Sequence, residues 1–130
     1  MQKIFQSVLL LTLIAILQGC TTLADARKAE GEGVRKVYKA NIDKSWNATI
    51  KVLSKLKLDV ATENKTDGYI LAQRGISALS YGENIAIFLK PKNQQETEVE
   101  VVSKKAMSTN IFAPDWTKDI HNELQMSLAK

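Results

Sequence analysis

The sequence predicts an α+β domain of two layers, with an antiparallel sheet of about five strands and two helices on one face. Two segments, at 46–56 and 116–128, place apolar residues three or four positions apart, as on the buried stripe of a helix. Before and between them, short segments alternate apolar and polar residues, as half-buried strands do. The predicted order is β-α-β-β-β-β-α in a single domain at 34–130, after a cleaved signal peptide at 1–19.

The N-terminal segment has the layout of a secretory signal peptide. Lys3 supplies an early positive charge, and Val8 to Leu17 is an almost unbroken apolar run of ten residues. A helix that crosses a bilayer needs about 20 apolar residues, so this run is too short to span. It matches the apolar region of a signal peptide, which is about 7–15 residues long and precedes small residues at the cleavage site.

The only cysteine of the chain follows this run in the segment Leu17-Gln18-Gly19-Cys20. A single cysteine closes no intramolecular disulfide. The segment resembles the lipobox of bacterial lipoproteins, although Gln18 departs from the usual small or aliphatic residue. The resemblance implies cleavage between Gly19 and Cys20, with diacylglycerol on the sulfur and an acyl chain on the new amine. The alternative is an uncleaved membrane anchor with an incidental cysteine.

The residue after the cysteine bears on localisation. In bacterial lipoproteins an Asp at that position favours the inner membrane, and here the residue is Thr21. We therefore expect a lipid-anchored protein of the outer membrane that faces the periplasm, with the membrane as a partner through the anchor. The formal net charge of +4 is only mildly basic. No nucleic-acid partner is expected, because an exported lipoprotein rarely meets nucleic acid.

Residues 20–33 predict a lipidated cysteine followed by a flexible tether. The segment is rich in small and charged residues and shows no apolar periodicity. A flexible chain of this length has a root-mean-square span of roughly 20 Å, enough to hold a domain just clear of the headgroups. The alternative for part of this segment is a short helix over Leu23 to Lys28.

The first strand and the first helix follow directly. In the segment VRKVYKANI, one set of residues, Tyr38, Ala40 and Ile42, alternates with a second set, Val37, Lys39 and Asn41, which predicts a half-buried strand. Asp43 or Ser45 then offers an N-cap for a helix of about twelve residues. Its apolar stripe consists of Trp46, Ile50, Leu53 and Leu56.

Two further strands are predicted at 58–74. Their alternating segments flank Asp67-Gly68, a turn signal. If Ile70 and Ala72 lie on the inner face of the sheet, Tyr69 and Leu71 lie on the outer face. The alternative is that Ile70 points outward instead. The segment 75–84 is then a connection bounded by glycines.

The segments IAIFLKP and TEVEVVS predict an antiparallel hairpin with a definite register. If Leu89 lies opposite Val99, then Ile87 faces Val101 on the same side of the sheet. In this register, two Lys–Glu pairs face each other on the other side, Lys90 with Glu98 and Lys92 with Glu96. A slip of one residue would spoil both sets.

The last element is a second amphipathic helix. Pro114 and Asp115 mark its start. One apolar stripe runs to the C-terminal end through Trp116, Ile120, Leu124 and Leu128.

A family resemblance rests on several of these segments together: KVYKANIDKSWNATIKVLSKLKLDV, GYILAQ, IAIFLKP and TEVEVVS. The chain resembles a family of small bacterial lipoproteins of unknown function, loosely over 34–128. The resemblance implies an α+β domain related in architecture to the helix-grip domains of the lipoprotein BamC. None of the matching positions is a catalytic signature, and function does not follow from fold.

The sequence offers little catalytic chemistry. His121 is the only histidine, and we expect it on the solvated side of the second helix, without a nucleophile and an orienting acid. One histidine with scattered carboxylates gives no metal-ligand spacing. We therefore predict no enzyme activity, no metal and no cofactor beyond the lipid on Cys20.

A partner surface is predicted on the outer face of the sheet. Leu71, Phe88 and Val102 would form a contiguous apolar patch there, larger than single exposed apolar residues imply. Tyr81, in the connection at 75–84, is a further candidate. The alternative is that scattered surface apolar residues are ordinary and that this connection covers the edge of the core.

Two function hypotheses follow. The leading one is a non-catalytic interaction or structural module, with an envelope protein as its partner. The alternative is a module that binds a small ligand or lipid in a cleft between helix and sheet, which requires an apolar cavity of roughly 300 Å³ or more. The sequence does not indicate the oligomeric state.

Overall fold

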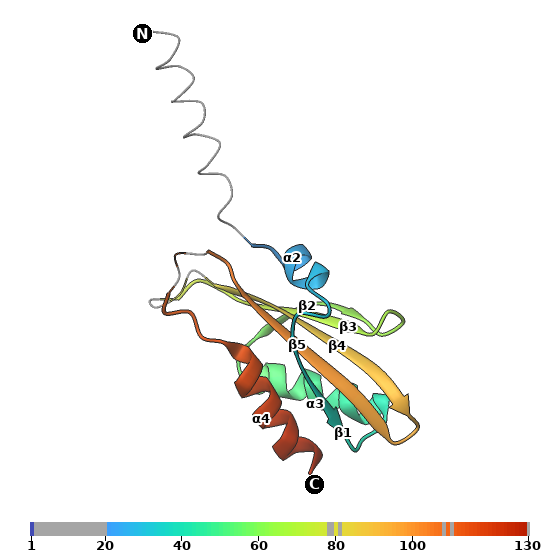
Figure 1. The fold of residues 1–130 in the computed structure, drawn as a ribbon. Coiled ribbons are helices and arrows are strands. Elements are labelled where there is room, and N and C mark those ends of the chain that lie inside the picture. Colours follow the sequence, from blue (N-terminus) through green and yellow to red (C-terminus); the bar gives the residue numbers. More distant parts are fainter. Residues whose placement is uncertain (2–20, 78–79, 81, 108, 110, 130) are drawn as a thin grey trace.

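The computed structural model describes residues 1, 21–77, 80, 82–107, 109 and 111–129 (Figure 1). The predicted cleavage site at Gly19 and Cys20, and Tyr81 of the predicted partner surface, lie outside the described residues. Among the residues described, no helix combines the length and the apolar character needed to cross a bilayer.

The fold class is α+β, as the sequence predicts. The elements are α2 (Leu23–Lys28), β1 (Val34–Tyr38), α3 (Ile42–Lys55), β2 (Asp59–Asn64), β3 (Tyr69–Arg74), β4 (Glu83–Asn93), β5 (Glu96–Lys105) and α4 (Trp116–Leu128). The strands form one antiparallel sheet in the order β1-β5-β4-β3-β2. Helices α3 and α4 cover one face of it, and α2 lies on the other (Figure 1).

Both long helices begin at a side-chain cap. At α3 the cap is Asn41, whose side-chain oxygen accepts a hydrogen bond from the N–H of Lys44 over 2.8 Å. The helix thus begins earlier than the predicted caps at Asp43 or Ser45. At α4 the cap is Asp115, as predicted, and it accepts from the N–H of Thr117 over 3.0 Å. Such caps satisfy N–H groups that have no partner within the helix.

The main core lies between the sheet and the two long helices. The predicted stripe residues of α4 are buried in it, apart from Leu128, which is partly buried. Inward residues of the strands meet them, including Ile70, Ile87, Leu89, Val99 and Val101. Full burial of side chains of this size stabilises the fold by about 1.5–3 kcal/mol each.

The predicted hairpin register is confirmed over most of its length. Leu89 faces Val99, Ile87 faces Val101 and Lys90 faces Glu98. The predicted pairing of Lys92 with Glu96 is wrong, because the register shifts between Pro91 and Asn93, and Asn93 faces Glu96 instead. A bulge of this kind adds one residue to one strand, and here it takes Lys92 out of the alternation.

The prediction of a flexible tether is wrong for residues 21–33. This segment forms α2 and packs on the sheet, with Ala26 and the C-cap residue Ala29 buried against it. The helix at Leu23–Lys28, left open by the sequence, is present. The folded unit therefore extends to Thr21 rather than beginning at residue 34.

Candidate functional site

The outer face of the sheet carries the predicted apolar cluster, but it is not exposed. Leu71, Phe88 and Val102 lie together and are only 8%, 2% and 3% exposed. Helix α2 covers them, with Ala26 and Ala29 in contact with the same cluster. The expectation of an open partner surface at these three residues is corrected, since the chain itself fills the place that a partner would take.

Helix α2 is short, and side-chain hydrogen bonds stabilise its N-terminal end. Thr22 and Asp25 form a capping box, in which the Thr22 N–H donates to the Asp25 carboxylate over 2.7 Å. The Asp25 N–H donates in return to the Thr22 hydroxyl over 3.3 Å. The Thr22 hydroxyl also donates to the Asp25 carboxylate over 2.8 Å, and this bond, followed by the one from the Thr22 N–H, lowers the pKa of Asp25. A pattern of Thr followed three residues later by an acid is the local signal that predicts this helix start.

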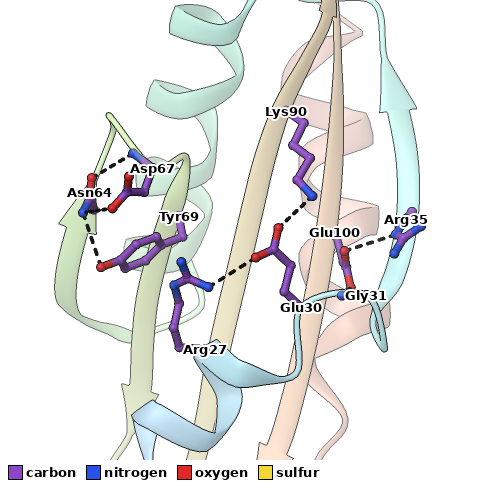
Figure 2. Close-up of polar contacts among 9 residues, drawn as sticks. All are labelled: Arg27, Glu30, Gly31, Arg35, Asn64, Asp67, Tyr69, Lys90 and Glu100. Carbon is purple, nitrogen blue, oxygen red and sulfur yellow. Dashed lines mark hydrogen bonds and ion pairs between the residues drawn. The ribbon is translucent and has the colours of Figure 1, made fainter.

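Charged side chains fasten the C-terminal end of α2 to the sheet (Figure 2). The guanidinium of Arg27 lies over the ring of Tyr69, 4.3 Å from its centroid, and also pairs with Glu30 over 3.2 Å. Glu30 in turn pairs with Lys90 of β4 over 2.7 Å. The hydrogen bond from Lys90 is the main cause that lowers the pKa of Glu30.

Glu100 of β5 holds the connection between α2 and β1 (Figure 2). Its carboxylate is buried and accepts hydrogen bonds from the N–H groups of Gly31 over 2.7 Å and Gly33 over 2.8 Å. Arg35 completes the set with an ion pair of 3.1 Å. Nothing in the local sequence of the connection indicates this contact, because the acceptor lies on a distant strand.

The connection also passes very close to the sheet at Gly33. A Cβ atom built there would lie 2.5 Å from the carbonyl oxygen of Val101 and 2.8 Å from a methyl group of Val102. A residue without a side chain is therefore required at this point. The close approach keeps the chain flat against β5.

Thr21, the first residue described after the predicted lipid site, is fixed to one end of the sheet. Its N–H donates to the carbonyl oxygen of Ala106 over 2.9 Å, and its hydroxyl donates to the carbonyl oxygen of Lys105. Its own carbonyl oxygen accepts from the side-chain amide of Asn84 over 2.9 Å. Every polar group of Thr21 is therefore bonded to the domain.

His121 is buried, which corrects the expectation of a solvated histidine. The Tyr38 hydroxyl lies 2.8 Å from Nδ1 of His121, and the carbonyl oxygen of Val34 lies 2.9 Å from Nε2. Since a carbonyl only accepts, Nε2 carries the proton and Nδ1 accepts from Tyr38. Burial lowers the pKa of His121 and raises the pKa of Tyr38 to about 12. Both groups are therefore held neutral.

The surroundings of His121 differ from those of a histidine that serves as a general base in a nucleophile–base–acid arrangement. The hydroxyl beside His121 belongs to Tyr38, and the group that orients its other nitrogen is a backbone carbonyl rather than a carboxylate. A nucleophile–base pair normally needs a third group that stabilises the imidazolium. Within the same residues no group of His, Cys, Asp and Glu could hold a metal ion.

Two open grooves bear on the ligand hypothesis. One, of about 620 Å³, lies between residues 39–41 and the β4–β5 turn at residues 93–96. The other, of about 630 Å³, lies between α3 and α4 and is lined by Lys51, Val52, Lys55, Glu123, Met126, Ser127 and Ala129. Neither is the predicted cavity between helix and sheet. The inward residues Leu89 and Val99, which would line that cavity, are fully buried in the core.

No protein-family model matches this chain, and a search of curated proteins found no matching relative. The resemblance to small bacterial lipoproteins therefore stays a prediction from the sequence.

Proposed function

We propose that the chain is a lipid-anchored lipoprotein of the outer membrane whose domain is a non-catalytic structural or interaction module facing the periplasm. In this proposal the signal peptide is removed between Gly19 and Cys20. Cys20 then carries diacylglycerol and an N-acyl chain. The membrane is the partner through the anchor, and neither a metal nor another cofactor is required.

The observation that carries this proposal is the segment Leu17-Gln18-Gly19-Cys20 after its apolar run, and the structure adds that the next residue, Thr21, is attached directly to the sheet. Thr21 follows Cys20 in the chain, and its backbone and hydroxyl are bonded to Lys105, Ala106 and Asn84. An acylated Cys20 would therefore join the bilayer to the folded domain with no free linker between them. One acyl chain gives only marginal attachment, whereas two or more hold a protein stably at the membrane.

The module role is supported by the covered outer face and by the chemistry of the buried polar groups. The charged residues Glu30 and Glu100 hold the segment behind the anchor in place, and the buried pair of Tyr38 and His121 is neutral. An envelope protein that bound Leu71, Phe88 and Val102 would have to displace α2 first.

Fractionation of cells that express the full chain tests the anchor. We expect the wild-type protein in the outer-membrane fraction of a density gradient, and the Cys20→Ser variant outside it. The matched control is Thr22→Ser, which keeps both the lipid site and a hydroxyl at the N-cap and should fractionate like the wild type. If Cys20→Ser also fractionates like the wild type, the lipid on Cys20 does not hold the protein and the proposal fails.

A further inference from the structure

Three large apolar side chains stand exposed on two connections of the domain. Ile76 is 80% exposed, Ile111 is 73% exposed and Phe112 is 78% exposed. Ile76 lies in the connection from β3 to β4, and the other two lie in the connection from β5 to α4. Single exposed apolar residues are ordinary, but three on neighbouring loops indicate a surface that binds another molecule or a membrane.

The two connections leave the sheet at the same end. In the strand register, Arg74 at the end of β3 lies opposite Glu83 at the start of β4. Glu83 in turn lies opposite Lys105 at the end of β5. The Ala106 N–H donates to the carbonyl oxygen of Gly82 over 3.0 Å, which joins the two connections directly. Figure 1 shows both at the end of the sheet nearest the start of α2.

The anchor-proximal residue lies at this same end. Thr21 is hydrogen-bonded to Lys105 at the end of β5, to Ala106 just after it, and to Asn84 near the start of β4. Consecutive Cα atoms are about 3.8 Å apart, so the Cα of Cys20, the preceding residue, lies about that far from the Cα of Thr21. Lipid chains on Cys20 would therefore enter the bilayer beside Ile111 and Phe112 rather than at a distance from them.

We infer that this end of the domain, the membrane tip formed by Ile76, Ile111 and Phe112, inserts its apolar side chains into the lipid surface next to the acylated Cys20. The inference rests on the proposed lipid anchor and adds a second contact with the membrane. The bilayer is what would cover the tip, because Thr21 is hydrogen-bonded at this end of the sheet and the acyl chains on the neighbouring Cys20 would enter the bilayer there. The exposed Lys105 at the same end suits anionic headgroups.

Membrane insertion of the tip fixes the orientation of the domain. Strand β4 runs from Glu83 at the tip to Asn93, and each residue of a strand advances it by about 3.4 Å. The turn at Gln94 and Gln95 would therefore stand roughly 35 Å from the lipid surface if the strand is upright. This turn provides a control position on the same sheet.

Depth measurements on the acylated protein test the inference. The Cys20 sulfur is consumed by the lipid, so Phe112→Cys or Gln95→Cys provides the one free thiol for a nitroxide label. The labelled proteins are reconstituted in vesicles of phosphatidylethanolamine and phosphatidylglycerol. We expect the label at 112 to collide several-fold less with a water-soluble nickel complex, and more with oxygen, than the label at 95.

A second pair of variants tests whether the tip acts as a unit. With the label at Ile76→Cys, the double change Ile111→Asp and Phe112→Asp should raise collisions with the nickel complex toward the value at position 95. The matched control, Gln94→Asp with Gln95→Asp, adds the same charge at the far end and should leave the label at 76 shielded.

The outcomes separate the inference from the proposed function. Intact mass and flotation with the vesicles, on the same samples, report the anchor. If the protein is acylated and floats, but labels at 76 and 112 are as water-exposed as the label at 95, the inference is overturned and the anchor stands. If the labels are shielded in native membranes but not in pure lipid, a protein covers the tip and the inference is also overturned. If the chain is not acylated, both the proposed lipid anchor and the inference about the membrane tip are contradicted.

Discussion

The buried carboxylate of Glu100 accepts a hydrogen bond of 2.7 Å from the backbone N–H of Gly31, a residue 69 positions earlier in the chain. This contact joins the last long strand to the segment that follows the predicted lipid site. Together with the bond from Gly33 and the ion pair with Arg35, it keeps α2 and its connection on the outer face. The stability of the domain and the position of the proposed anchor are therefore linked.

Replacing Glu100 by alanine should destabilise the fold. The N–H groups of Gly31 and Gly33 would lose their acceptor, and a polar group left unpaired in a buried site costs about 1–3 kcal/mol. Urea unfolding measures the change in the free energy of unfolding. The control is Glu98→Ala on the same strand, which is half-buried and should cost less. Equal effects of the two variants would contradict the role of Glu100.

A charge on the buried side of α2 should uncover the outer face. Ala26 is fully buried against the sheet, whereas Ala24 of the same helix is exposed. Ala26→Glu should therefore undock α2 and expose Phe88, since burying a carboxylate without a partner is costly. Binding of a dye that fluoresces on apolar surfaces should rise. Ala24→Glu adds the same charge and should leave the fluorescence unchanged, and a similar rise in both variants would refute the docking.

Adding one methyl group at Gly33 should be more costly than adding it at Gly75. At Gly33 a Cβ would lie 2.5 Å from the carbonyl oxygen of Val101, but at Gly75 no atom lies within 4 Å. Gly33→Ala should lower the free energy of unfolding by about 1–3 kcal/mol, as overpacking does. Gly75→Ala should be neutral or slightly stabilising. Thermal unfolding of both variants compares them, and a neutral Gly33→Ala would show that the connection has room to move.

The stability of the domain should fall as the pH drops below about 6.5. Burial lowers the pKa of His121 from 6.5, so the unfolded chain takes up a proton in this window that the folded chain does not. The unfolded state is then favoured, by at most about 1.4 kcal/mol per pH unit from one group.

Urea unfolding at pH 8 and pH 5.5 checks this, with His121→Gln as the comparison because glutamine does not titrate. Asp25 and Glu30 have pKa values lowered from 3.8 and 4.5, so both titrate below this window. The variant should lose less stability between the two pH values than the wild type. An equal loss in both would mean that His121 is not the titrating group.

The parts of the fold that the sequence predicts are those set by local patterns. Alternation and charge together determine the pairing of Leu89 with Val99, and the four-residue spacing determines the stripe of α4. The bulge at Lys92 was not predicted, because a pattern of alternation assumes regular pairing through Pro91. The prediction for His121 is wrong because α4 buries a wider face than the predicted stripe: Thr117 and His121 are buried beside Ile120.

The candidate site was predicted only in part, for a physical reason. Period-two alternation correctly puts Leu71, Phe88 and Val102 on one face. Their burial depends on a six-residue helix whose buried contacts are mainly alanines, so it has little apolar signal of its own. The contacts that hold it, from Glu100 and Lys90, come from strands about 60 or more residues away. Such long-range contacts leave no local trace in the sequence.

The intact mass of the protein extracted from the outer membrane is the most direct test of the lipid anchor. The account predicts a polypeptide that begins at Cys20 and is heavier than its amino acids by one diacylglycerol and one acyl chain. Tandem fragmentation should put the whole added mass on Cys20. An unmodified chain that still begins at Met1, or added mass on any other residue, would contradict it.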